Sequence, residues 1–260
     1  MGCGQAVYEQ RLENTKRYYG HLGQLNANLA AEWQGPGISI RPPLGFVLIP
    51  SPQRPENAVA AGRGDGADPA DAAVLDERQP NFVNLDLPGL IAAWKWESFD
   101  AEGQARSQQT SYMYLLSNQE IGANPELREQ ALKFHDNTLR ELSNTLEANV
   151  PRDDKGGTAL VPEQFPANRD VFVAQLTYDS IALDTDVSND RTNRTFSCHL
   201  FTQGEVQVIV LFVYSDVAEH QDVLLKRIPL CLETLTVSGD KIGVPATTIT
   251  GPSSTKSGGF

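Results

Sequence analysis

The sequence predicts an α+β domain, a mainly antiparallel sheet covered by helices on both faces, with a long N-terminal helix. Three observations lead there. Apolar residues recur every three or four positions across residues 5–33. Strand-like runs crowd together between residues 171 and 214, with short polar turns between them. The run 206–213 is almost wholly apolar, so we expect a central strand with both faces covered.

The N-terminal helix is predicted over residues 5–33, ended by Gly35-Pro36-Gly37. Its apolar stripe comprises Tyr8, Leu12, Thr15, Tyr19, Leu22, Leu25, Leu29 and Trp33. Such a stripe packs on its own domain or on a partner helix. Gly20 and Gly23 weigh against a coiled coil, because glycine lowers helix stability.

Short strands flank a Pro/Gly turn between Ile38 and Pro50, and alternating residues predict strands over 90–97 and 111–117. The tripeptide Asn124-Pro125-Glu126 begins a helix predicted to run to Asn149. Its expected inner stripe is Leu127, Ala131, Phe134, Leu142 and Leu146.

The later strands are predicted over 171–178, 181–187, 195–202 and 206–214, with a hairpin turn at Gln203-Gly204. A closing helix is expected over 216–237, kinked or divided by Pro229.

These elements predict three regions along the chain. Residues 1–35 form an N-terminal helical segment, and residues 36–238 form one sandwich domain. Residues 51–80 are rich in Pro, Gly, Ala and Asp, and we expect a flexible surface loop there. Residues 239–260 are expected to be a disordered tail.

The net charge of −12 disfavours nucleic acid and anionic lipid headgroups as partners, because both carry negative charge. No apolar run approaches the roughly 20 residues that span a membrane. The three cysteines form no C-x-x-C pair. Cys198 and Cys231 lie in apolar runs typical of inert buried thiols, and a bridge between them stays open.

Two resemblances follow from particular stretches. A strand, prolines, a glycine and an aromatic residue follow one another in Ile38-Ser39-Ile40-Arg41-Pro42-Pro43-Leu44-Gly45-Phe46. This stretch resembles the opening hairpin of the Mog1/PsbP-like α/β/α sandwich. The closing strand and helix of that fold are similar to Gly204–Tyr214 followed by the 216–237 helix. The resemblance implies a small, non-enzymatic binding or assembly protein, and it carries over no binding residue. Separately, Met1-Gly2-Cys3-Gly4-Gln5 resembles the end of a bacterial lipoprotein signal, with Cys3 as the lipid-attachment residue, although the hydrophobic stretch before it is missing.

Two groups of residues are candidates for catalysis or metal binding. Cys198 and His199 are adjacent, and neighbours on a strand point to opposite faces, so they cannot act as nucleophile and base together. Asp184, Asp186, Ser188 and Asp190 alternate like calcium ligands, but Asn189 and Thr195 stand where a glycine and a glutamate are needed. We therefore predict no catalytic, cofactor-binding or metal residues, and no cofactor.

The favoured hypothesis is a non-catalytic binding or assembly protein of the bacterial cell envelope, tethered at Cys3 and contacting a protein partner through residues 5–33 and 51–80. A cytoplasmic location is the alternative. A second hypothesis is an enzyme with an unrecognised site near His199, Asp184 or Asp186. A third is a small-molecule carrier, with a groove lined by Trp94, Trp96, Tyr112 and Tyr114.

Overall fold

The computed structural model describes residues 3–52, 76–80, 83, 85–98, 109–148, 150–167, 175–185, 194–215 and 218–242. Most of the loop predicted over 51–80, and all of 243–260, lie outside these residues. Of Cys3, Gly4, Asp184 and Thr185 only the backbone is described.

The described residues form a seven-stranded sheet in which all neighbouring strands are antiparallel. In spatial order its strands are β3 (Val47–Ile49), β4 (Leu90–Trp96), β5 (Ser111–Ser117), β9 (Val206–Ser215), β8 (Arg194–Gln203), β7 (Leu176–Thr185) and β6 (Val161–Phe165). The predicted central strand is confirmed, because β9 pairs with both β5 and β8. The predicted hairpin turn also forms, with Gly204 in the left-handed region at φ 60°.

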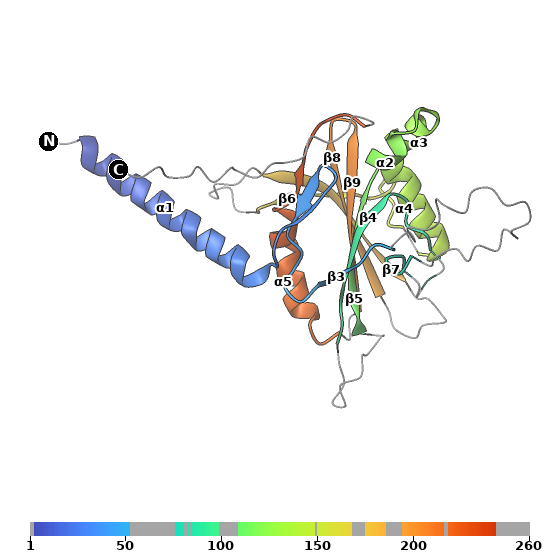
Figure 1. Ribbon diagram of the computed structural model, residues 1–260, viewed down its shortest axis with the longest axis horizontal. Coiled ribbons are helices and arrows are strands. Elements are labelled where there is room, and N and C mark those ends of the chain that lie inside the picture. Colours follow the sequence, from blue (N-terminus) through green and yellow to red (C-terminus); the bar gives the residue numbers. More distant parts are fainter. Residues whose placement is uncertain are drawn as a thin grey trace, which may run out of the picture.

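Each face of this sheet carries its own hydrophobic core, and helices cover both faces (Figure 1). On one side, the α5 core joins Trp94, Met113, Val210 and Phe212 to Leu224, Ile228 and Cys231 of α5 (Gln221–Leu232). On the other side, the α4 core joins Tyr114, Cys198, Ile209 and Leu211 to Phe134, Leu139 and Leu142 of α4 (Phe134–Thr145). The predicted α+β class with helices on both faces is therefore confirmed.

A small second sheet lies on the α5 side. Its strands, in order, are β1 (Trp33–Gly35), β2 (Ile38–Ile40) and β10 (Thr236–Val237). Because β2 pairs with β1 and β10 while β3 pairs with β4, the two strands flanking the Pro/Gly turn are not one hairpin. The expectation of an opening hairpin over 38–46 is wrong. Ile38 and Ile40 are instead fully buried in the α5 core.

The N-terminal helix, α1 (Cys3–Asn28), ends earlier than its apolar periodicity predicts. The backbone N–H of Ala30 donates to the carbonyl of Pro42, and Leu29 bridges to Pro43. These contacts with the segment at Pro42 and Pro43 take the place of further hydrogen bonds within the helix, so the helix ends here. Trp33 therefore lies in β1, with its ring edge on Trp94, 5.5 Å between centroids.

The helix predicted over 124–149 is broken. Asn124 caps it as expected, accepting from the N–H of Glu126. The segment then divides into a 3-10 turn η3 (Pro125–Leu127), α3 (Arg128–Leu132) and α4, with α2 (Gln119–Gly122) just before. The side chain of Gln207 fills the break: its Nε2 donates to the carbonyl of Leu132, and its Oε1 accepts from the N–H of His135. A side chain from β9 thus satisfies the groups that a continuous helix would have paired.

Two further boundaries differ from the predictions. The strands predicted over 171–178 and 181–187 are one strand, β7, because Asp179 and Ser180 stay in register with β8. The closing helix α5 is shorter than 216–237, and it continues through Pro229 rather than dividing there. Beyond β10, Ile242 is buried in the α5 core, so packed chain extends past Ser238.

Candidate functional site

The C-terminal end of α1 is fastened to the domain by three kinds of contact. Leu25 and Leu29 are buried in the α5 core. The guanidinium of Arg41 donates to the carbonyls of Leu29 and Ala30 and to Oδ1 of Asn26. A cation here also opposes the negative end of the helix dipole. Burial, hydrogen bonding and electrostatics therefore all act on the last two turns.

His21 and Glu233 meet where α1 crosses the end of α5. Nε2 of His21 lies 2.9 Å from Oε1 of Glu233, whose side chain is only 3% exposed. Burial raises the pKa of Glu233 to about 7 and lowers the pKa of His21. Both shifts follow from the cost of placing a charge away from water.

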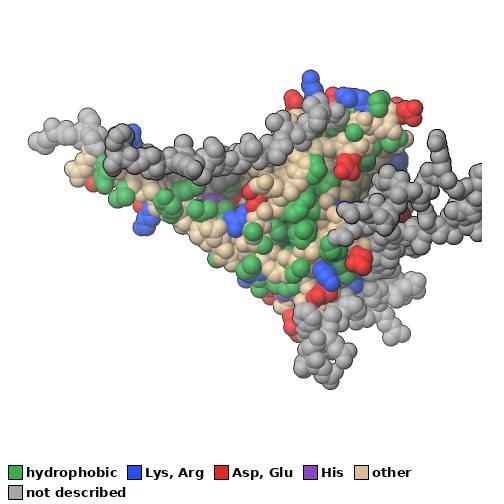
Figure 2. Space-filling model, in the orientation of Figure 1, with side chains coloured by type: hydrophobic (Ala, Val, Ile, Leu, Met, Phe, Trp, Pro, Cys, Tyr) green, Lys and Arg blue, Asp and Glu red, His purple; other side chains and the backbone are tan. Residues whose placement is uncertain are grey.

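The rest of α1 projects away from the sheet (Figure 1). Every described side chain from Gln5 to Tyr19 is exposed except the half-buried Asn14. Tyr8, Leu12 and Tyr19 are 66%, 57% and 65% exposed, and Figure 2 shows hydrophobic side chains along this helix. The sequence predicted these three as one stripe, and within α1 the domain covers only the C-terminal end of that stripe.

The projecting helix also differs from the rest of the chain in charge. Residues 3–28 hold three basic and two acidic side chains, whereas the whole chain has a net charge of −12. Arg17 pairs with Glu13 one turn away on the face opposite the stripe, Nε to Oε1 3.3 Å. Cys3, the predicted lipid-attachment residue, is the first residue of α1, at the end remote from the domain.

A second candidate site surrounds His199 on β8. Its Nδ1 lies 2.8 Å from Oγ of Ser180 and 3.6 Å from Oε2 of Glu163, and its Nε2 lies 3.0 Å from Oγ of Ser197. The His199 and Ser180 side chains together hold the pKa of Glu163 below its usual value. His199 is buried, whereas Ser197 and Glu163 are half-buried. This arrangement places a hydroxyl on one imidazole nitrogen and a carboxylate near the other.

Sequence reasoning identified His199 but missed its three neighbours. Ser197-x-His199 on a predicted strand would have placed these two on one face. Ser180 lies on β7 and Glu163 on β6, and they come close to His199 only through the register in which β6, β7 and β8 pair.

The expectation that Cys198 and His199 point to opposite faces is confirmed. Cys198 lies in the α4 core and is fully buried, and burial raises the pKa of its thiol to about 12. Cys231 is fully buried in the α5 core, across the sheet, and burial raises its pKa as well. Both thiols are free, so the alternative of a bridge between them is excluded by their positions.

The four aromatic residues considered for a ligand groove do not come together. Trp94 and Trp96 pack in or against the α5 core, whereas Tyr112 and Tyr114 belong to the α4 side of the sheet. Trp96 stacks on His220, with centroids 4.2 Å apart, and His220 lies between Oγ atoms of Ser98 and Ser111. The expectation of a single groove lined by all four aromatic rings is therefore wrong.

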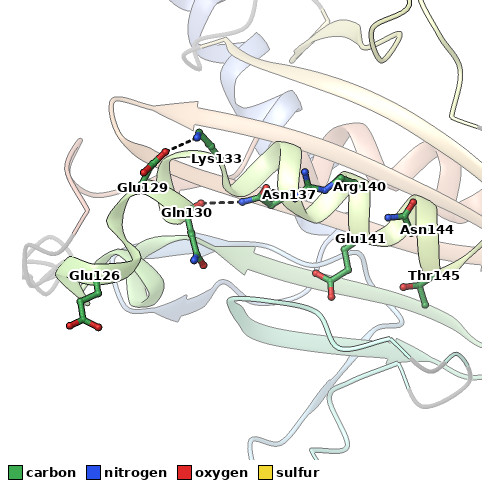
Figure 3. A pocket seen from close by; sticks show the side chains of 9 residues that line it. All are labelled: Glu126, Glu129, Gln130, Lys133, Asn137, Arg140, Glu141, Asn144 and Thr145. Atoms are coloured by element: carbon green, nitrogen blue, oxygen red, sulfur yellow. Dashed lines mark hydrogen bonds and ion pairs between the residues drawn. The ribbon is translucent and has the colours of Figure 1, made fainter.

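An open depression of about 810 Å³ lies along the outer face of α3 and α4 (Figure 3). It is lined by Glu126, Glu129, Gln130, Lys133, Asn137, Arg140, Glu141, Asn144 and Thr145. Lys133 pairs with Glu129 at 2.7 Å, and Arg140 donates to Asn137. Charged side chains that already pair with neighbours three or four residues away are typical of a solvated surface rather than of a ligand site.

Several candidate residues lie outside the described chain. These are Asp186, Ser188 and Asp190 of the calcium-like series, and the side chain of Asp184. Within the described residues, no group of three His, Cys, Asp or Glu side chains could hold a metal ion. The described helices include none that is long and apolar enough to span a bilayer.

Comparison with known protein families and with curated proteins finds no match to this chain. Among solved structures, a crystal structure from Bacteroides thetaiotaomicron VPI-5482 is similar to 80% of this chain, with 9% sequence identity and a TM-score of 0.29. The similar region spans 48% of that protein. With identity and TM-score both this low, the comparison assigns neither a family nor a function.

Proposed function

We propose that this is a non-catalytic binding or assembly protein that holds a protein partner along the projecting part of α1. The observation that supports the proposal is the exposure of Tyr8, Leu12 and Tyr19 on a helix whose other end is firmly fixed. An isolated helix of about 15 residues is only marginally stable in water. A partner that buries the stripe would supply the missing packing.

A photocrosslinking amino acid at position 12 tests this proposal in cells that make the protein. Position 10 is the matched control, because Gln10 is also exposed and, at 3.6 residues per turn, points away from Leu12 on the opposite side of the helix. We expect a discrete protein adduct from position 12 and none from position 10. Equal labelling from both positions, or none from either, would refute a partner on the stripe.

Location at the cell envelope through a lipid on Cys3 is part of the same proposal. Cys3 is the first residue of α1, at the N-terminal tip of the projecting helix, where a lipid could reach a membrane. Intact mass of the natively made protein, from membrane and soluble fractions, tests it. A lipid adduct on Cys3 is expected, and an unmodified chain in the soluble fraction would favour the cytoplasmic alternative.

The geometry at His199 favours a second candidate function, ester hydrolysis. Oγ of Ser197 would attack the ester carbonyl while Nε2 of His199 takes its proton and later returns it to the leaving alcohol. Water would then release the acid from Ser197 by the same route. Glu163 would stabilise the protonated imidazole from its Nδ1 side.

A chromogenic ester gives a direct measurement of this second candidate. Ser197→Ala is expected to abolish turnover, whereas Ser180→Ala should retain a measurable fraction, because Ser180 is on the Nδ1 side. No turnover by the wild type, or equal turnover by Ser197→Ala, would remove this candidate.

A further inference from the structure

The stripe on α1 is arranged like the seam of a two-helix coiled coil. Tyr8, Leu12, Thr15 and Tyr19 follow one another at spacings of four, three and four residues, which is the heptad pattern. All four side chains are exposed in the described structure. The unpartnered seam is therefore about two heptads long.

The residues that border the seam are different on its two sides. Glu9 and Lys16 immediately follow Tyr8 and Thr15, so they share one border, with opposite charges one heptad apart. Arg11 and Tyr18 immediately precede Leu12 and Tyr19, so they share the other border. Each border thus holds two groups that attract one another: carboxylate with ammonium, and guanidinium with an aromatic ring.

From this arrangement we infer that α1 pairs antiparallel with α1 of a second copy of this chain, which names the partner and so rests on the proposed function. In an antiparallel pair each border faces the same border of the partner. Glu9 then meets Lys16 of the second copy, and Arg11 meets Tyr18, each twice by symmetry. In a parallel pair, the border with Arg11 would instead lie against the partner's border with Lys16. Arg11 would then meet Lys16 of the second copy, which is a repulsive contact.

The shape of the molecule is consistent with antiparallel pairing of the two α1 helices. The domain follows the C-terminal end of α1, so antiparallel pairing places the two domains at opposite ends of the helix pair (Figure 1). When Leu12 lies level with Thr15 of the second copy, the partner's helix begins about where α1 enters the domain at Leu25. The exposed length of the helix therefore matches the length that the pair would bury.

Charge reversal tests this pairing in the full-length chain by sedimentation over a concentration series at low salt. Glu9→Lys and Lys16→Glu each turn two attractive contacts into two repulsive ones, so each should weaken dimerisation about tenfold or more. An equimolar mixture of the two variants should recover the wild-type affinity, because every border pair is again opposite in charge. Glu13→Lys, with the same charge change on the opposite face, should leave dimerisation unchanged.

Other outcomes overturn the inference and separate it from the proposed function. Antiparallel self-pairing would be refuted by a wild type that stays monomeric at every concentration. It would also be refuted if the mixture dimerised no more tightly than either variant alone, or if Glu13→Lys weakened dimerisation as much as Glu9→Lys. A monomeric wild type that still gives an adduct with a different protein from position 12 would leave the proposed function standing. Leu12-dependent binding of the unlipidated chain to vesicles would assign the stripe to a membrane instead.

Discussion

At the scale of single residues, neighbours in the sequence have separate environments. Cys198 and His199 share a peptide bond, yet one is buried in the α4 core and the other sits among polar groups on the opposite face. The pleat of a strand dictates this separation, so it was predictable from the sequence. The partners Ser180 and Glu163 were not, because strand register depends on the whole sheet.

The buried thiols should be unreactive in the native protein. In a Cys3→Ser variant, the remaining thiols are Cys198 and Cys231, both fully buried and both with pKa values raised by burial. A thiol reagent attacks the thiolate, so we expect no native-state labelling at pH 8 and two labelled thiols after unfolding. Rapid native labelling would show that one of the two cores opens readily.

Glu233 should make stability depend on pH. Its pKa in the folded protein, about 7, lies above the ordinary glutamate value of 4.5. The stability that the uncharged side chain contributes is therefore fully present below pH 4.5 and is lost as pH rises through about 7. Glu233→Gln keeps the side chain uncharged at every pH. At pH 8 we therefore expect the free energy of unfolding of this variant to be about 2 kcal/mol higher than that of the wild type. Urea denaturation at pH 5 and pH 8 measures the difference, which should shrink at pH 5. Glu141→Gln, at an exposed position, is the control and should change neither value.

At the scale of elements, the sequence indicated where helices and strands exist, and long-range contacts determined where they stop. The alternation over 90–97 and 111–117 gave β4 and β5 nearly residue for residue. Arg41 and Pro42 end α1, and Gln207 separates α3 from α4. These groups come from outside the helices that they end, so no local pattern within the helices could reveal their effect.

Two glycines should respond in opposite directions to alanine. Gly20 lies inside α1 with open space around it, so Gly20→Ala should stabilise the helix by up to about 1 kcal/mol. Gly204 has a positive φ, and a Cβ there would lie 2.2 Å from the carbonyl oxygen of Asp240. Gly204→Ala should therefore destabilise the domain by at least about 1 kcal/mol. Helix content by circular dichroism and urea denaturation measure the two effects, and a neutral Gly204→Ala would contradict the turn geometry.

At the scale of the whole molecule, composition and periodicity were enough for the fold class but not for the strand order. The apolar run in β9 correctly predicted two covered faces. The small sheet was missed, because β1 and β10 are too short to show a pattern and β10 comes from the other end of the chain. The resemblance to Mog1/PsbP-like proteins stays a prediction.

The projecting part of α1 should be dispensable for the fold. Among the described side chains, deletion of residues 1–18 removes exposed ones and the half-buried Asn14, and it keeps His21, Leu25 and Leu29. Under conditions where the chain is monomeric, the free energy of unfolding should change by less than about 0.5 kcal/mol. A loss of several kcal/mol would mean that this segment packs on the domain.

The fixed root of α1 makes the helix a lever. From Leu25 to Cys3 the axis extends about 33 Å, at 1.5 Å per residue. A tilt of about 10° at the root would swing the tip by about 6 Å, roughly one helical turn. The short contacts that Arg41 and Glu233 make with the base of α1 therefore control, over a far greater distance, where the remote end of the helix can reach.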